Sequence, residues 1–167
     1  MMESTGVFFS RALERMAVFD AWAAKYAPQA IADHICYKCE SADEFEAIRK
    51  LFETESAFIY QSIISNRRIA IVKFLQPIPS ALGEIWFLEL SDQKPDGSQA
   101  SEFDHIEMYP TAGSMDDLAA SLESKSVIVE KIVRPHHTTF DTIVEASFKV
   151  RIEPEPLVTK IVRDEMK

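Results

Sequence analysis

A strand-like stretch with the core Asp-His-Ile occurs twice in this chain, at residues 33–35 and again at residues 104–106. Each copy alternates polar and apolar residues, as a strand with one buried face does. Each is followed by small or polar turn residues and then by apolar residues at helical spacing, over about 42–53 and 114–124. A repeated strand–helix unit predicts a fold built from two similar halves.

Strand patterns follow each of the two predicted helices. They lie at 57–64, 68–75 and 84–91 in the first half, and at 127–133, 137–144 and 146–153 in the second. Each half therefore has the element order β-α-β-β-β, which is a stronger signal than the repeated tripeptide alone. A turn-rich loop at residues 92–98 marks the boundary between the halves.

Residues 5–27 are predicted to form an N-terminal helix, because their apolar side chains recur at helical spacing until Pro28 ends the element. The fold class is therefore α+β, with this helix packed on the outside of the sheet. One structural domain in three parts is expected: an N-terminal helix at 1–30, a first module at 31–98, and a second module with a C-terminal tail at 99–167.

Composition narrows the class of protein. Of the 167 residues, 47% are hydrophobic, which is enough for a substantial core, and the formal charge is −9. An acidic chain without a basic run argues against nucleic-acid or anionic-membrane partners. There is no apolar stretch of about 20 residues and no secretory signal pattern, and only two cysteines are present. A soluble cytoplasmic protein is expected.

Each half carries one histidine on its first strand and one glutamate on its last strand. His34 on the first strand pairs in this way with Glu89, and His105 pairs with Glu153. Glu107 shares the face of His105. If the halves pack about a pseudo-twofold axis, two imidazoles and two carboxylates converge in one cleft. Such a set suits a divalent first-row metal: zinc, nickel, cobalt, iron or manganese.

A simpler interpretation remains open for the two histidines, which can sit at strand ends with hydrogen bonds to Asp33, Asp104 or the backbone. The Cys-x-x-Cys spacing of Cys36 and Cys39 is interpreted as coincidence, because residues three apart on a strand face opposite ways.

Three polar residues of the second half are candidates to contact substrate or support the ligands: His137, Asp141 and Arg151. Neighbouring residues on a strand cannot both face one cleft, so at most one of His136 and His137 serves the site.

Taken together, these features resemble the vicinal oxygen chelate superfamily, which includes glyoxalase I and the extradiol dioxygenases. Residues 87–91, a glutamate between aliphatics followed by serine, look like the metal-bearing strand of glyoxalases. Within the superfamily the chain is similar to the small bacterial YecM family, through the following positions: Asp33-His34-Ile35, Cys39, Asn66-Arg67-Arg68-Ile69, Lys73-Phe74, Trp86, Glu89-Leu90, Asp104-His105-Ile106-Glu107, His136-His137, Thr139-Phe140-Asp141 and Arg151-Ile152.

The resemblance implies two modules that form a curved, barrel-like mixed sheet around a cleft, with metal ligands at His34, Glu89, His105 and Glu153. Two departures from the patterns of these enzymes narrow the range of expected activities. The Asp-Pro-x-Gly turn that glyoxalases carry before the last glutamate is missing, since residues 146–148 read Ala-Ser-Phe. Glutamate at position 89 also disfavours an extradiol dioxygenase.

The expected function is that of a metal-dependent enzyme, of the lyase or isomerase kind, acting on a small oxygen-rich substrate. The metal would chelate two vicinal oxygens as a Lewis acid, and Glu107 or Glu153 would transfer the proton. The alternative is a non-catalytic protein that binds a small ligand or a metal on the same scaffold. A small-molecule partner is expected, and a monomer and a homodimer are both compatible with the sequence.

Overall fold

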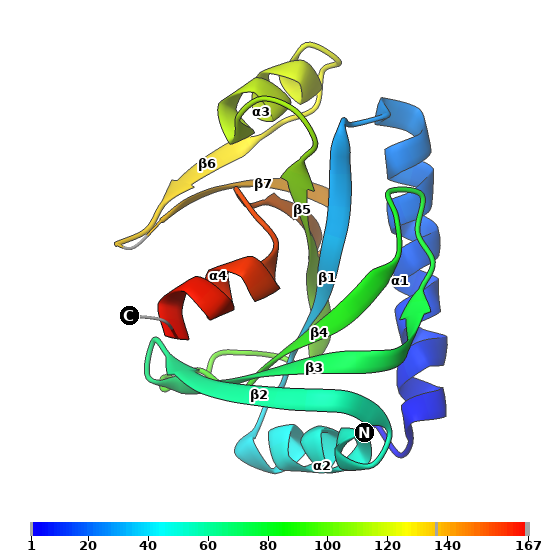
Figure 1. Ribbon diagram of the computed structural model, residues 1–167, viewed down its shortest axis with the longest axis vertical. Helices are drawn as coiled ribbons and strands as arrows, with labels where there is room; N and C mark the ends of the chain where they lie inside the picture. The colour runs from blue at the N-terminus through cyan, green and yellow to red at the C-terminus, as the bar shows by residue number, and fades with distance from the viewer. Residues whose placement is uncertain (1, 136, 166–167) are drawn as a thin grey trace.

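The computed structural model describes residues 2–135 and 137–165. Within these residues, eight strands form one mixed sheet in the order β2-β3-β4-β1-β5-β8-β7-β6, and four helices accompany it (Figure 1). The helices are α1 (Thr5–Tyr26), α2 (Ala42–Glu53), α3 (Met115–Glu123) and α4 (Leu157–Glu165). The strands are β1 (Ala30–Lys38), β2 (Ser56–Ile64), β3 (Arg67–Ile78), β4 (Ile85–Ser91), β5 (Glu102–Pro110), β6 (Glu130–Val133), β7 (Thr138–Glu145) and β8 (Phe148–Ile152).

Strands β1 and β5 lie side by side at the centre of the sheet and run antiparallel. Each central strand has a parallel neighbour from its own half, β4 beside β1 and β8 beside β5. Ile35 pairs with Ile106 at the middle of the central ladder. A twofold rotation about this point exchanges the halves, so the predicted α+β fold with two β-α-β-β-β modules is confirmed.

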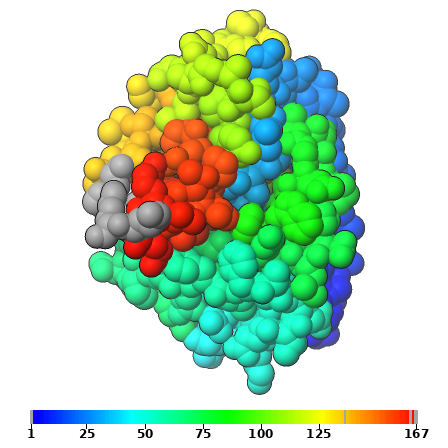
Figure 2. Space-filling model, in the orientation of Figure 1, coloured from blue at the N-terminus to red at the C-terminus, as the bar shows by residue number. Residues whose placement is uncertain are grey.

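The expected curved, barrel-like mixed sheet is confirmed as a mixed sheet, but it does not close into a barrel. Strands β2 and β6 stand at its two edges, β2 paired with β3 and β6 paired with β7. Closure would require β2 and β6 to pair with each other, and β6 has only four residues, which are mostly exposed. Instead, helix α4 lies between the two halves of the open sheet, and part of it reaches the molecular surface (Figures 1 and 2).

Helix α1 covers one face of the sheet, as expected for the N-terminal helix. Ser4 caps it by accepting a hydrogen bond from the Val7 amide, and it ends at Ala27, which has φ 43° ahead of Pro28. The Phe8 side chain is fully buried, and its ring lies against those of Tyr37, Phe74 and Phe103, among others. Since Tyr37 and His34 alternate on β1, α1 leaves the His34 face to other elements.

The C-terminal tail, which showed weak helical character in the sequence, forms α4 on the His34 side of the sheet. Its first amide, that of Leu157, donates to Asp33 Oδ2 at 3.0 Å, next to His34. At its other end, the Tyr60 hydroxyl on β2 donates to Glu165. In the part of the chain that the structure describes, no helix is both long and apolar enough to cross a membrane.

Candidate metal centre

Each of the two Asp-His pairs lies at an irregularity in the central ladder. On β1, Asp33 is an extra residue between the pairs Ala32↔Met108 and His34↔Glu107, and on β5 the extra residue is Asp104. A β-bulge of this kind interrupts the alternation and redirects a side chain. Both aspartates therefore reach their neighbouring histidines, with Oδ2 at 2.7 Å from Nδ1 in each pair.

These contacts fix the chemistry of the two imidazoles. When Nδ1–H donates to a carboxylate, the neutral ring presents its Nε2 lone pair on the other side, which is the arrangement found in carboxylate–histidine–metal triads. Hydrogen bonding to aspartate and metal ligation are therefore compatible, because each would use a different nitrogen of the ring.

The Nε2 atoms of His34 and His105 point at carboxylates from two strands. His34 Nε2 lies 3.2 Å from Glu89 Oε2 and 3.3 Å from Glu107 Oε2, while His105 Nε2 lies 3.3 Å from Glu107 Oε1. One ligand atom from each of these four residues lies within 4.8 Å of every other. Metal bonds of 2.0–2.1 Å at tetrahedral angles separate ligand atoms by about 3.3 Å, so the donor set fits a small divalent cation.

The four side chains are withdrawn from solvent: both histidines and Glu107 are buried, and the Glu89 side chain is 20% exposed. Burial opposes the charged form of His34, but Glu107 and hydrogen bonds to Asp33, Glu107 and Glu89 outweigh it and hold the His34 pKa well above its ordinary value. Burial likewise opposes ionisation of Glu89 and Glu107, yet the neighbouring histidines keep both pKa values low. The negative charges of Glu89 and Glu107 therefore compensate a positive charge in the group, whether it comes from a proton on His34 or from a bound metal.

The structure brings three of the four predicted ligands together, and the fourth place in the group is taken by Glu107. Glu153 follows β8, with its amide bonded to the carbonyl of Met108 and its Oε1 3.6 Å from His137 Nε2. Burial, and then repulsion from Glu107, raises the pKa of Glu153 to about 7. Its assignment as a ligand stays a prediction.

The strand register explains why Glu107 stands in the group at the place predicted for Glu153. Cys36 pairs with Glu89 between β1 and β4, and Glu107 pairs with Arg151 between β5 and β8. Under the twofold rotation Cys36 corresponds to Glu107, and Glu89 corresponds to Arg151. The second half thus carries its carboxylate on the inner strand. Because Glu107 stands two residues after His105, the sequence repeat contained a signal for this position.

Arg151 is held by Asp141, whose carboxylate accepts from Nε at 2.8 Å and from Nη2 at 3.0 Å. The third nitrogen, Nη1, lies 3.5 Å from His105 Nε2. Arg151 therefore contacts the group, and Asp141 is connected to it through Arg151. His137 contacts Glu153, with Nε2 3.6 Å from Oε1, and burial together with the positive charge of Lys160 lowers the pKa of His137. His136 lies outside the described residues.

The two cysteines are free and buried, and they lie in different surroundings. Cys36 lies beside the group, with Sγ 3.6 Å from Glu89 Oε1, and burial followed by the charge of Glu89 raises its pKa well above the ordinary value. It is therefore a protonated thiol beside a carboxylate. Cys39 contributes its amide to Ser91 and its carbonyl to Gln99, away from the histidines.

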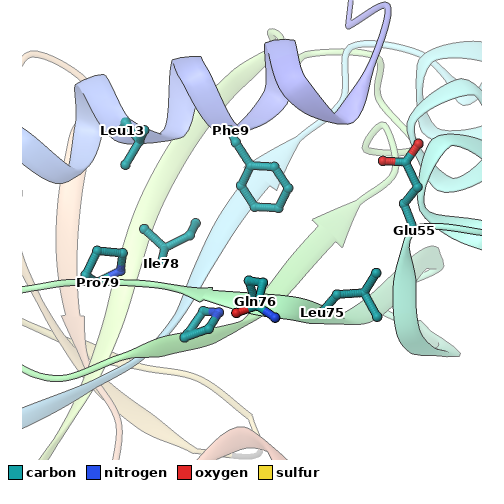
Figure 3. Close-up of a pocket in the computed structure, with 8 residues that line it drawn as sticks. Phe9, Leu13, Glu55, Leu75, Gln76, Ile78 and Pro79 are labelled. Atoms are coloured by element: carbon teal, nitrogen blue, oxygen red, sulfur yellow. The ribbon is translucent and has the colours of Figure 1, made fainter.

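An apolar cavity of about 390 Å³ lies elsewhere, between α1 and the end of β3 (Figure 3). Phe9 and Leu13 line one wall and residues 75–79 the other, and the polar lining residues are Glu55 and Gln76. Neither His34 nor His105 lines this cavity.

Comparison with known proteins supports the sequence resemblance. The model of the family described as YecM protein matches residues 10–153. A solved structure titled "Structural Genomics, Protein EC4020" is 19% identical, with a TM-score of 0.72, and the match covers 93% of this chain and 90% of that one.

Other matching structures are more distant. Methylmalonyl-CoA epimerase from Streptomyces coelicolor is 18% identical, with a TM-score of 0.48 and coverage of 75% and 98%. The fosfomycin resistance protein FosX from Listeria monocytogenes, solved with manganese, is 14% identical, with a TM-score of 0.30 and coverage of 77% and 94%. Among curated proteins no match to the chain is found.

Proposed function

Because this chain belongs to the YecM family, we propose that it is a metal-dependent enzyme of the vicinal oxygen chelate type, acting on a small oxygen-rich substrate. The observation that carries the proposal is the buried group of His34, Glu89, His105 and Glu107, whose ligand atoms all lie within 4.8 Å of one another. Two neutral imidazoles and two carboxylates match the charge of a divalent first-row metal. Zinc, nickel, cobalt, iron and manganese all fit this donor set.

Each residue of the site has a distinct role in this proposal. Asp33 and Asp104 hold the two rings so that each Nε2 faces the centre. A divalent metal bound there would act as a Lewis acid toward a substrate oxygen and stabilise negative charge that develops on it. Burial of the group keeps bulk water from competing for the same positions.

Glu153 is the proposed proton-transferring residue. It is buried, its charge interacts with that of Glu107, and its pKa is about 7, so both of its protonation states are populated at neutral pH. Glu107 also shares the site, but its carboxylate contacts both histidines and its pKa is held low, which suits a ligand better than a base.

The test is the metal content of chelator-free protein, measured by elemental analysis for the wild type and for His34→Ala and Glu89→Ala. The proposal predicts close to one first-row metal per wild-type chain and loss of most of it in both variants. Glu44→Gln is the matched control, because Glu44 is a buried glutamate that binds Tyr37 and Ser101 instead. Wild-type protein that neither contains nor takes up metal would contradict the proposal.

A second function, metal or ligand binding without catalysis, is favoured by one feature. His34 is 0% exposed and His105 is 1% exposed, so a substrate cannot reach their Nε2 atoms in this conformation. Catalysis requires that part of the site opens, whereas metal storage or a structural metal does not. In a cobalt-loaded protein, ligand-dependent changes in the spectrum together with turnover of the ligand would support the enzyme. Spectral changes without turnover would support a ligand-binding protein, and no change with any oxygen-chelating ligand would support metal storage or a structural metal.

A further inference from the structure

The charged residues around the proposed metal group break the twofold symmetry of the fold. In the first half, the position on the outer strand next to the group is Glu89, opposite Cys36. In the second half, the equivalent position on β8 is Arg151, opposite Glu107. A cation thus stands where symmetry would place a second outer carboxylate.

The orientation of this cation is fixed. Asp141 takes the Nε and Nη2 edge of the guanidinium at 2.8 and 3.0 Å, and the Arg151 side chain is only 15% exposed. A bidentate pair of this kind holds the plane of the guanidinium in one orientation. Nη1 therefore cannot turn away and remains directed at the group.

Arg151 Nη1 makes only a long, weak contact with the group. Its acceptor is His105 Nε2, at the long distance of 3.5 Å. When that lone pair binds a metal, as the proposed function requires, the acceptor is lost, and a buried charged donor without an acceptor is costly. A ligand that brings an anionic oxygen beside the metal replaces it.

We infer that Arg151 is the anion-binding residue of this site, and that the substrate is a small carboxylate carrying a neighbouring oxygen, such as a 2-oxo or 2-hydroxy carboxylate. This inference rests on the proposed function. The carboxylate would accept from Arg151 Nη1, and one of its oxygens and the neighbouring oxygen would be available to a metal held by the four residues. Asp141 is a positioning residue, since it acts only through Arg151.

The experiment measures binding of oxalate to metal-loaded protein by calorimetry, after metal binding itself has been measured for every variant. Oxalate is a simple carboxylate with vicinal oxygens. The inference predicts that oxalate binds the wild type and that Arg151→Gln weakens it at least tenfold, while metal affinity changes much less. Arg68→Gln is the matched control, because Arg68 also pairs with an aspartate, Asp92, but outside the site.

Arg151→Gln leaves Asp141 unpaired and could therefore fail to fold. Arg151→Lys is the second variant for that case. Lysine keeps the charge and can pair with Asp141, but it has no second nitrogen to direct at the group, so oxalate binding is again predicted to fall at least tenfold. Equal oxalate affinity in the wild type and the folded Arg151 variants, or no oxalate binding to metal-loaded wild type, would overturn the inference and leave the metal site intact. Failure of the wild type to bind metal would overturn the proposed function as well.

Discussion

At the scale of single residues, Asp33 and Asp104 orient the two histidines, because a β-bulge brings each aspartate beside its neighbouring histidine. Asp104 accepts from His105 Nδ1 at 2.7 Å and also contacts Lys38 Nζ at 3.0 Å. Burial opposes its charge, but the hydrogen bond and charge of His105, together with Lys38, keep the pKa of Asp104 below its usual range. It is therefore an anion at every physiological pH, and it orients the ring and makes Nε2 a better ligand.

The variant Asp104→Asn tests this role. Metal affinity is predicted to fall by about 10- to 100-fold, the usual effect of removing such a partner, while the fold is retained because asparagine has the same shape. Calorimetric titration with zinc measures the change. Asp92→Asn is the control, since Asp92 is also buried but pairs with Arg68. Equal losses in the two variants would show that the effect is not specific to the site.

A second prediction concerns pH. The raised pKa of His34 means that, without metal, its Nε2 carries a proton at neutral pH. A metal must displace this proton, so apparent affinity is predicted to rise with pH until the His34 pKa is passed and then to level off. Titrations in buffers of different ionisation enthalpy count the protons released. A pH-independent affinity with no proton release would contradict direct ligation by His34.

At the scale of elements, α4 closes the histidine face. It is tied at one end to Asp33, the same carboxylate that orients His34, and at the other to Tyr60 on β2. Among its described side chains none is fully buried, so it is held more weakly than the core helices. This combination is typical of an element that opens.

Removal of residues 157–167 is therefore predicted to speed metal uptake several-fold with little loss of fold. Stopped-flow mixing with a metal-sensitive dye measures the rate, and circular dichroism checks the fold. Tyr60→Phe, which removes only the contact at the far end, should give a smaller increase. Identical uptake rates in all three proteins would show that α4 does not limit access.

Helix α1 contrasts with α4 because its contacts lie in the core. Phe8 is 0% exposed and contacts rings from β1, α2, β3 and β5. Phe8→Ala is predicted to lower the free energy of unfolding by about 3–5 kcal/mol through the cavity it leaves, measured by urea denaturation. Phe58→Ala, at a ring that is 46% exposed on β2, should cost much less. Similar losses would contradict the anchoring role of Phe8.

At the scale of the whole molecule, the sequence predicted the arrangement of elements better than the details of the site. Alternation and helical spacing placed the strands and helices close to their observed bounds, because both patterns report which face is buried. The sheet edges could not be predicted, since closure depends on how far β2 lies from β6 rather than on any local pattern.

Only part of the site could be predicted from the sequence, because alternation does not hold along the whole of each strand. His34, Glu89 and His105 follow from alternation, which holds along most of each strand. Alternation fails at the bulges: strict alternation would put Asp33 on the face opposite His34, whereas its carboxylate lies 2.7 Å from the His34 ring. Assuming strict symmetry also pointed to the last strand for the fourth ligand. The register instead puts Arg151 at that place and Glu107 beside it.

The most direct measurement is an anomalous difference map from crystals soaked with zinc. The account predicts one strong peak at the twofold centre, about 2.0–2.2 Å from Nε2 of His34 and His105 and from oxygens of Glu89 and Glu107. A map without a peak at these histidines, or with a peak bound by His137 and Glu153 instead, would contradict it.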